Sequence, residues 1–183
     1  MNLNLTKEKS LLILVNIVFG VILLFSYYYY IKYGGVSAKI LWGRSFSVKN
    51  LYVTSMVLAA IGYLLLLGFS IFKTMNSTKN RALLSNLIII QCLILVMSML
   101  WLPLTLFYIK EGRNTNTMLA ILIVLFIVGI AGFKQIRIIQ NLTPESTSYA
   151  KMTQTASVVG AGVFFIHTFL FDFIGWSYGF FHK

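Results

Sequence analysis

Apolar residues occupy five long runs along the chain, and short polar stretches separate these runs. The runs cover Leu11–Ile31, Leu51–Phe72, Leu83–Ile109, Met118–Phe133 and Ala156–Phe181. A helix needs about 20 apolar residues to cross a hydrocarbon layer of about 30 Å, and it satisfies its own backbone hydrogen bonds in lipid. The pattern therefore predicts an all-α, polytopic membrane protein folded as a compact bundle of five transmembrane helices.

The ends of the runs set the expected helix limits within a single transmembrane domain covering residues 1–183. The helices are expected at about residues 11–31, 51–72, 83–109, 118–139 and 154–181. The fourth run is short, but Lys134 and Arg137 follow it at helical spacing, as in a helix that emerges into the lipid headgroups. The first run is longer than the apolar core of a signal peptide, so we expect the chain to retain it.

Residues 32–50 form the most informative connection between two runs. Apolar side chains such as Trp42 and Phe46 alternate there with basic ones such as Lys39 and Arg44. This pattern fits an amphipathic segment lying in the membrane interface, and it equally fits a loop with aromatic anchors. The remaining connections are too short to hold a soluble domain.

Composition and charge agree with a membrane protein. The chain is 58% hydrophobic and 10% charged, whereas soluble domains contain about 25% charged residues. The net charge of +11 raises the possibility of nucleic acid as a partner. The basic residues instead lie singly or in pairs at the ends of apolar runs, where they reach anionic headgroups, so nucleic acid is excluded. The 15 Lys and Arg residues divide eight to seven between the two membrane faces, which leaves the orientation and the identity of the membrane open.

Polar residues inside the apolar runs are the main candidates for function, because such groups are costly in hydrocarbon. They are Asn16, Gln91, His167 and Asp172, and Asp172 is the only acid within a predicted span. In an α-helix, His167 points about 140° away from Asp172, so the two are not expected to pair. Asp172 can hold a proton or cation, bind a ligand N–H group, or stay protonated and join helices.

Several kinds of chemistry are not expected from this sequence. Cys92 is the single cysteine, so the chain forms no intrachain disulfide. The second of the two histidines, His182, lies at the end of the sequence and does not complete a metal site. No phosphate-binding glycine loop or nucleophile elbow is present. Catalysis by the protein's own side chains is therefore not expected.

Small residues spaced four apart occur twice in the fifth run. Ala156 and Gly160 form one pair, and Gly175 and Gly179 form the other. Such pairs let two helices approach closely in a membrane. They serve either a homodimer or packing within one chain, and the sequence leaves both interpretations open.

Three fragments carry a resemblance to a known family. They are Trp101–Phe107 in the third run, Asp172–Trp176 in the fifth run and Leu51–Tyr52 at the start of the second. These fragments are similar to patterns in helices 3, 5 and 2 of the translocator protein family, also called tryptophan-rich sensory proteins. The resemblance implies a five-helix bundle that binds a tetrapyrrole, a sterol or a synthetic ligand among its helices. It also implies that Trp101, Asp172 and Trp176 contribute to that pocket, with Asp172 standing where the family has an amide.

We expect the pocket to be lined by the third and fifth spans and capped by residues 32–50. Pro103 cannot donate a backbone hydrogen bond, so it is expected to kink the third span and to open space beside Trp101. The expected ligand-binding residues are Trp42, Gln91, Trp101, His167, Asp172 and Trp176.

The leading hypothesis is a small integral membrane protein that binds a hydrophobic, tetrapyrrole-like or sterol-like ligand within the bundle. One alternative is a structural accessory subunit of a larger membrane complex. Another is a small transporter or channel whose path is lined by Asp172 and Gln91. The expected partners are the lipid bilayer, a hydrophobic small molecule, and a second copy of the chain or a larger membrane complex.

Overall fold

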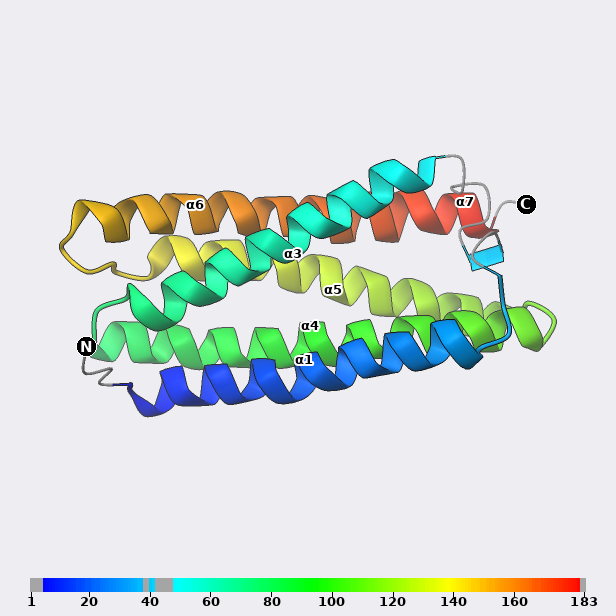
Figure 1. Ribbon diagram of the computed structural model, residues 1–183, viewed down its shortest axis with the longest axis horizontal. Coiled ribbons are helices and arrows are strands. Elements are labelled where there is room, and N and C mark those ends of the chain that lie inside the picture. Colours follow the sequence, from blue (N-terminus) through cyan, green and yellow to red (C-terminus); the bar gives the residue numbers. More distant parts are fainter. Residues whose placement is uncertain (1–4, 38–39, 42–47, 182–183) are drawn as a thin grey trace.

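The computed structural model describes residues 5–37, 40–41 and 48–181, and these residues form five long helices (Figure 1). The first four are α1 (Lys7–Tyr33), α3 (Lys49–Phe72), α4 (Thr78–Lys110) and α5 (Thr115–Asn141). The fifth is continuous and consists of α6 (Ser148–Phe165), the π-helix η2 (Ile166–Trp176) and α7 (Ser177–Phe181). All five are long and apolar enough to cross a membrane, which confirms the predicted all-α bundle of five spans.

Polar side chains fix where several helices begin. Thr6 accepts a hydrogen bond from the backbone N–H of Lys9 at the start of α1, and Ser77 and Thr147 cap α4 and α6 in the same way. Each cap satisfies one of the N–H groups that the first helical turn leaves unpaired. Helices α4 and α6 consequently begin five and six residues earlier than the apolar pattern predicts.

The helices run up and down and pack side by side. Helix α4 lies between α1 and α5, and α6 packs against α5 (Figure 1). Helix α3 packs against α6 and crosses the bundle obliquely (Figure 1). Because the number of crossings is odd, the N-terminal end of α1 and the C-terminal end of α7 lie at opposite ends of the bundle (Figure 1).

Two loops pair with each other at the end of the bundle where α1 begins; we call this the tied end. One loop joins α3 to α4 and the other joins α5 to α6. The backbone N–H of Met75 donates to the carbonyl oxygen of Thr143 at 3.1 Å, and that of Glu145 donates to the carbonyl oxygen of Lys73 at 2.9 Å. These bonds fasten α3 and α4 to α5 and α6.

Two buried polar side chains strengthen the tied end. The Asn80 amide nitrogen donates to the carbonyl oxygens of Met75 and Thr143 at 2.8 and 2.9 Å, and its oxygen accepts from the Thr143 N–H at 2.9 Å. The Lys9 ammonium group donates to the carbonyl oxygen of Thr74 at 2.9 Å, with only 6% of the residue exposed. Helix α1 is thereby attached to the same pair of loops.

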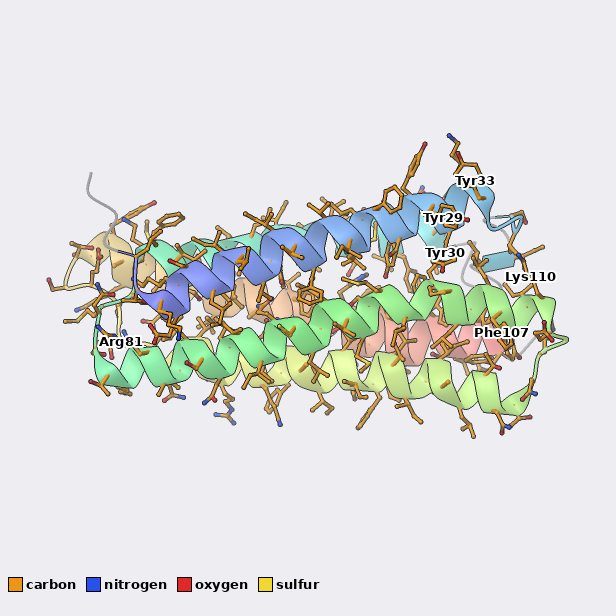
Figure 2. The ribbon with its side chains drawn as sticks, turned by 90° about the horizontal axis from the view of Figure 1, so that it is seen from below. Tyr29, Tyr30, Tyr33, Arg81, Phe107 and Lys110 are labelled. Atoms are coloured by element: carbon orange, nitrogen blue, oxygen red, sulfur yellow. The ribbon has the colours of Figure 1, made fainter. Side chains whose placement is uncertain are left out.

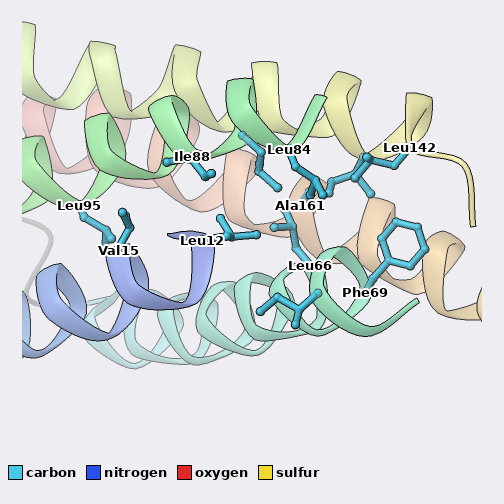
Figure 3. Packing of buried hydrophobic residues seen from close by; sticks show 12 residues of the cluster. Leu12, Val15, Leu66, Phe69, Leu84, Ile88, Leu95, Leu142 and Ala161 are labelled. Atoms are coloured by element: carbon cyan, nitrogen blue, oxygen red, sulfur yellow. The ribbon is translucent and has the colours of Figure 1, made fainter. Parts of the chain in front are cut away.

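The largest cluster of buried apolar side chains lies in the half of the bundle nearest the tied end. Leu12, Leu66, Phe69, Leu84 and Ala161 belong to four different helices, and each is at most 1% exposed (Figure 3). Between helices in lipid, close van der Waals packing of this kind supplies much of the association energy. The cluster therefore gives the bundle a rigid half.

Large apolar side chains also cover the outside of the bundle. Leu24 of α1 is 71% exposed and Leu64 of α3 is 66% exposed. A continuous apolar surface of this kind marks contact with a membrane or another protein. It agrees with helices that are long and apolar enough to cross a bilayer.

Small residues allow α3 and α6 to cross in direct backbone contact. A Cβ atom built on Gly62 would lie 2.4 Å from the carbonyl oxygen of Gly160, so no larger residue fits there. Gly175 faces the hydroxyl group of Tyr52, also within the same chain. Gly160 and Gly175 therefore serve packing within one chain, which is one of the two interpretations of the small-residue pairs.

Candidate functional site

Five of the six residues predicted to bind a ligand fall into three groups of direct contacts. Trp42 lies outside the described residues. Gln91 joins a network of amide groups, His167 and Asp172 contact each other, and Trp101 contacts Trp176.

His167 and Asp172 meet because the segment that carries them is a π-helix, not an α-helix. In a π-helix each backbone hydrogen bond spans five residues, which places residues five apart on adjacent turns of one face. The Nε2 atom of His167 consequently lies 3.5 Å from the Oδ2 atom of Asp172. The expectation that these two side chains point apart is wrong, because it assumed α-helical geometry.

Ser55 of α3 completes this group. Its Oγ atom lies 3.1 Å from the Nδ1 atom of His167, so both ring nitrogens have a polar neighbour. Serine, histidine and aspartate are also the residue types of acyl-transfer catalysis, which requires N–H donors directed at an oxyanion. Ser55 and His167 lie inside helices whose backbone N–H groups are used in helical hydrogen bonds. The group therefore favours proton sharing and hydrogen bonding over acyl transfer.

Trp101 and Trp176 form the centre of an aromatic cluster between α4 and the fifth helix. Their rings meet edge to face with centroids 5.3 Å apart, and the Trp101 ring also lies 6.0 Å from that of Tyr27 in α1. The Trp176 indole N–H donates to the carbonyl oxygen of Leu41 at 2.9 Å. The Trp101 indole N–H is buried with no hydrogen-bond partner among the described residues. A buried donor of this kind is suited to an oxygen atom of a ligand or a water molecule.

Gln91 belongs to a polar network that takes one side chain from each of four helices. The Tyr63 hydroxyl group contacts the amide oxygens of Asn16 and Gln91, and the Gln91 amide nitrogen donates to the oxygen of Gln135 at 3.0 Å. A tyrosine hydroxyl has one proton, so it can donate to the oxygen of only one amide. It accepts from the NH₂ group of the other amide when the O and N positions of that amide are exchanged. Both glutamines are fully buried. The network joins α1, α3, α4 and α5 inside the bundle.

A groove between α1 and α4 opens at the end opposite the tied end; we call it the tyrosine groove. It has a volume of about 400 Å³. Figure 2 shows the two helices diverging there, with Tyr29, Tyr30 and Tyr33 on α1 and Phe107 and Lys110 on α4. Its lining residues are Tyr29, Tyr30, Tyr33, Gly34, Pro103, Leu106, Phe107 and Lys110.

A second groove of about 370 Å³ lies between α3 and α6. Its walls are mainly apolar, with aliphatic residues such as Leu64 and Leu65 and the aromatic residues Phe69 and Phe72 among them. The Lys73 ammonium group and the Tyr149 ring mark one end, 4.9 Å apart. This groove presents to the outside the kind of surface that an acyl chain of a lipid covers.

Sequence reasoning missed Ser55, Tyr63 and Gln135. A serine or tyrosine in a long apolar run is a visible signal, since its hydroxyl group needs a partner in lipid. Gln135 lies within the predicted fourth helix, 118–139, but beyond the apolar run that ends at Phe133, so it is not among the polar groups inside the runs. Among the described residues, no group of three or more His, Cys, Asp or Glu side chains could hold a metal ion.

Comparison with known proteins gives no relative for this chain. No protein-family model, no curated protein and no solved structure matches it.

Proposed function

We propose that the protein binds an amphipathic small molecule that is soluble in the membrane and carries an anionic group, with the tyrosine groove as its site. The observation that carries this proposal is the lining of the groove. Aromatic rings from both α1 and α4 face the space, and Lys110 lies at its outer end (Figure 2).

The size and chemistry of the groove favour a flat, partly apolar ligand. Its volume of about 400 Å³ falls within the range of roughly 300 to 1,000 Å³ that is common for small-molecule sites. Aromatic rings such as those of Tyr30 and Phe107 offer faces and edges to a planar ligand. A tetrapyrrole with carboxylate groups fits both the rings and the lysine, whereas a sterol fits only the apolar part.

A second cation, Lys32, lies in the last turn of α1, between the groove residues Tyr30 and Tyr33 in the sequence. The Lys32 ammonium group donates to the Tyr28 hydroxyl group at 2.9 Å and lies over the rings of Tyr28 and Tyr33, at 5.3 and 5.2 Å from their centroids. Lysines at the ends of spans attract anionic groups at the membrane surface. The polar end of a bound ligand would therefore meet the Lys110 ammonium group in the groove, and Lys32 adds positive charge at the same end of the bundle.

The experiment is a titration of the purified protein in detergent with protoporphyrin, haem and cholesterol, followed by quenching of tryptophan fluorescence. Trp101 is a suitable reporter because its ring lies against Tyr27 of α1, on the same pair of helices as the groove. We expect saturable quenching by the two tetrapyrroles and weaker binding of cholesterol, which has no anionic group.

Two lysine variants test where the ligand binds. Lys110→Gln removes the cation of the tyrosine groove, and Lys73→Gln makes the same change in the groove between α3 and α6. We expect Lys110→Gln to weaken tetrapyrrole binding about fivefold, since such a pair contributes up to ~1 kcal/mol, and Lys73→Gln to leave it unchanged. Equal effects of the two substitutions, or no saturable binding by the folded wild type, would contradict the proposal. In the second case, a chain that elutes only as part of a larger complex would favour the accessory-subunit alternative.

A further inference from the structure

The group of Ser55, His167 and Asp172 lies where a charged side chain is most costly. Asp172 is nine residues before Phe181, the end of the fifth helix. Nine helical residues rise roughly 10 to 14 Å along the axis, which is about half the thickness of a 30 Å hydrocarbon layer. Its side chain is 33% exposed at the protein surface, and in a bilayer that surface meets lipid. Lipid favours the neutral carboxyl group, while the adjacent imidazole stabilises the carboxylate.

The hydrogen bonds of this group can be satisfied in two states that differ by one proton. In the first, the His167 Nε2–H faces the Asp172 carboxylate and the Ser55 hydroxyl donates to Nδ1. In the second, the Asp172 carboxyl O–H faces Nε2, and Nδ1–H donates to the serine oxygen. The 3.1 Å between Ser55 and Nδ1 is a hydrogen-bond distance, and the 3.5 Å between Nε2 and Asp172 is an ion-pair contact that a small side-chain rotation would shorten into either hydrogen bond. The added proton changes the tautomer of the neutral imidazole and removes one negative charge.

The described elements that pack against this pair contribute mainly apolar and aromatic side chains. Helices α3, α5, α6 and α7 pack against η2, and α5 meets it through phenylalanine and glycine. The cations of α5 and α6 lie toward the tied end, and Lys49 is six residues, or roughly 9 Å, before Ser55 on α3. Among the residues that the structure describes, the other titratable groups near the pair include Tyr52 of α3, Tyr178 of α7 and Tyr27 of α1, and Tyr27 interacts electrostatically with Asp172.

We propose that Ser55, His167 and Asp172 form a proton-binding site inside the bundle, which holds one exchangeable proton between the imidazole and the carboxyl group. The π-helical backbone of η2 is what makes the site, because it brings residues five apart onto one face. π-Helical segments are frequent at functional sites. This inference is independent of the tyrosine groove, which uses none of these three residues.

The chain offers an unusually direct test, because Asp172 is its only aspartate. Protein made with [4-¹³C]aspartate and ¹⁵N-histidine, reconstituted in phosphatidylcholine vesicles, gives a single carboxyl signal in solid-state NMR. The His182→Gln variant identifies the signals of His167. We expect the carboxyl signal to titrate with pH, and the His167 nitrogens to exchange tautomers at the same midpoint.

His167→Phe supplies the second measurement. Removal of the imidazole takes away the group that shares the proton with the carboxylate, so the Asp172 signal should titrate with a different midpoint. A carboxyl signal that does not titrate, or that titrates while the imidazole tautomer stays fixed, overturns the proposal. So does an unchanged midpoint in His167→Phe. The wild-type titration decides the question by itself if that variant does not fold.

Discussion

Gly62 of α3 and Gly160 of α6 lie backbone against backbone where the two helices cross. A Cβ atom on Gly160 would come within 2.6 Å of the Cα atom of Gly62, a distance that real structures do not tolerate. The same face of α6 carries Ser157, whose hydroxyl group donates to the carbonyl oxygen of Leu65 in α3 at 3.0 Å. This close approach positions α3, and therefore Ser55, against the fifth helix.

Gly160→Ala should destabilise the bundle. The new methyl group meets backbone atoms that cannot move independently, and overpacking of this kind costs about 1–3 kcal/mol. Gly162→Ala is the matched control, because a Cβ atom on Gly162 meets nothing within 4 Å. Thermal unfolding in detergent should show a lower midpoint for Gly160→Ala and an equal or higher one for Gly162→Ala. Equal midpoints for the two variants would show that the helices do not cross at Gly160.

Tyr63→Phe should destabilise the bundle through its polar network. Loss of the hydroxyl group leaves the amides of Asn16 and Gln91 without their shared partner, which costs about 1–3 kcal/mol for a buried polar group. Tyr149→Phe makes the same chemical change on a side chain that is 59% exposed, and it should have no effect. Unfolding by heat in detergent compares the two. A Tyr63→Phe variant as stable as wild type would mean that the amides pair among themselves.

Lys9→Met tests the attachment of α1 to the tied end. Methionine keeps the apolar stem but removes the ammonium group that donates to Thr74, a charge-assisted bond worth about 1.5–3 kcal/mol. Lys7→Met is the control two residues away, on an exposed side chain. Limited proteolysis near the start of α1 should become faster for Lys9→Met only. Equal rates for the two variants would contradict this assignment.

Asn80→Ala should loosen the two paired loops. The substitution removes three hydrogen bonds and leaves the Thr143 N–H without its acceptor. At about 1–3 kcal/mol for an unpaired buried group, amide hydrogen exchange over residues 142–147 should become roughly tenfold faster or more. Asn141→Ala, which removes only an exposed bond to the Arg137 carbonyl, is the control. Unaltered exchange in Asn80→Ala would show that the backbone pairing holds the loops without the side chain.

The five spans could be predicted because the bilayer imposes a length and a composition on each one, and these are readable without knowledge of packing. The face of each helix that packs against its neighbours could not be predicted. Helix α1 is apolar all round, so its sequence does not distinguish buried Leu12 from exposed Leu24. Neighbouring helices decide this, and the sequence does not show which helices are neighbours.

The candidate site shows the same limit at the scale of single residues. Asp172 and His167 stood out as polar groups in lipid, but their pairing depended on a π-helix. Nothing in the sequence pattern distinguishes this π-helical segment from an α-helix. Ser55 also did not stand out in the sequence. Its hydroxyl group contacts Nδ1 of His167, whereas Asp172 contacts Nε2.

The tied end has a consequence for the order in which the protein is assembled during synthesis. The ribosome delivers the loop after α3 long before the loop after α5, so the N–H of Met75 and the carbonyl of Lys73 must wait for their partners. Lys9 is already present and can bind the first loop alone. A nascent chain that stops before residue 142 therefore leaves this loop half-paired at the membrane surface, and arrival of the last hairpin closes it.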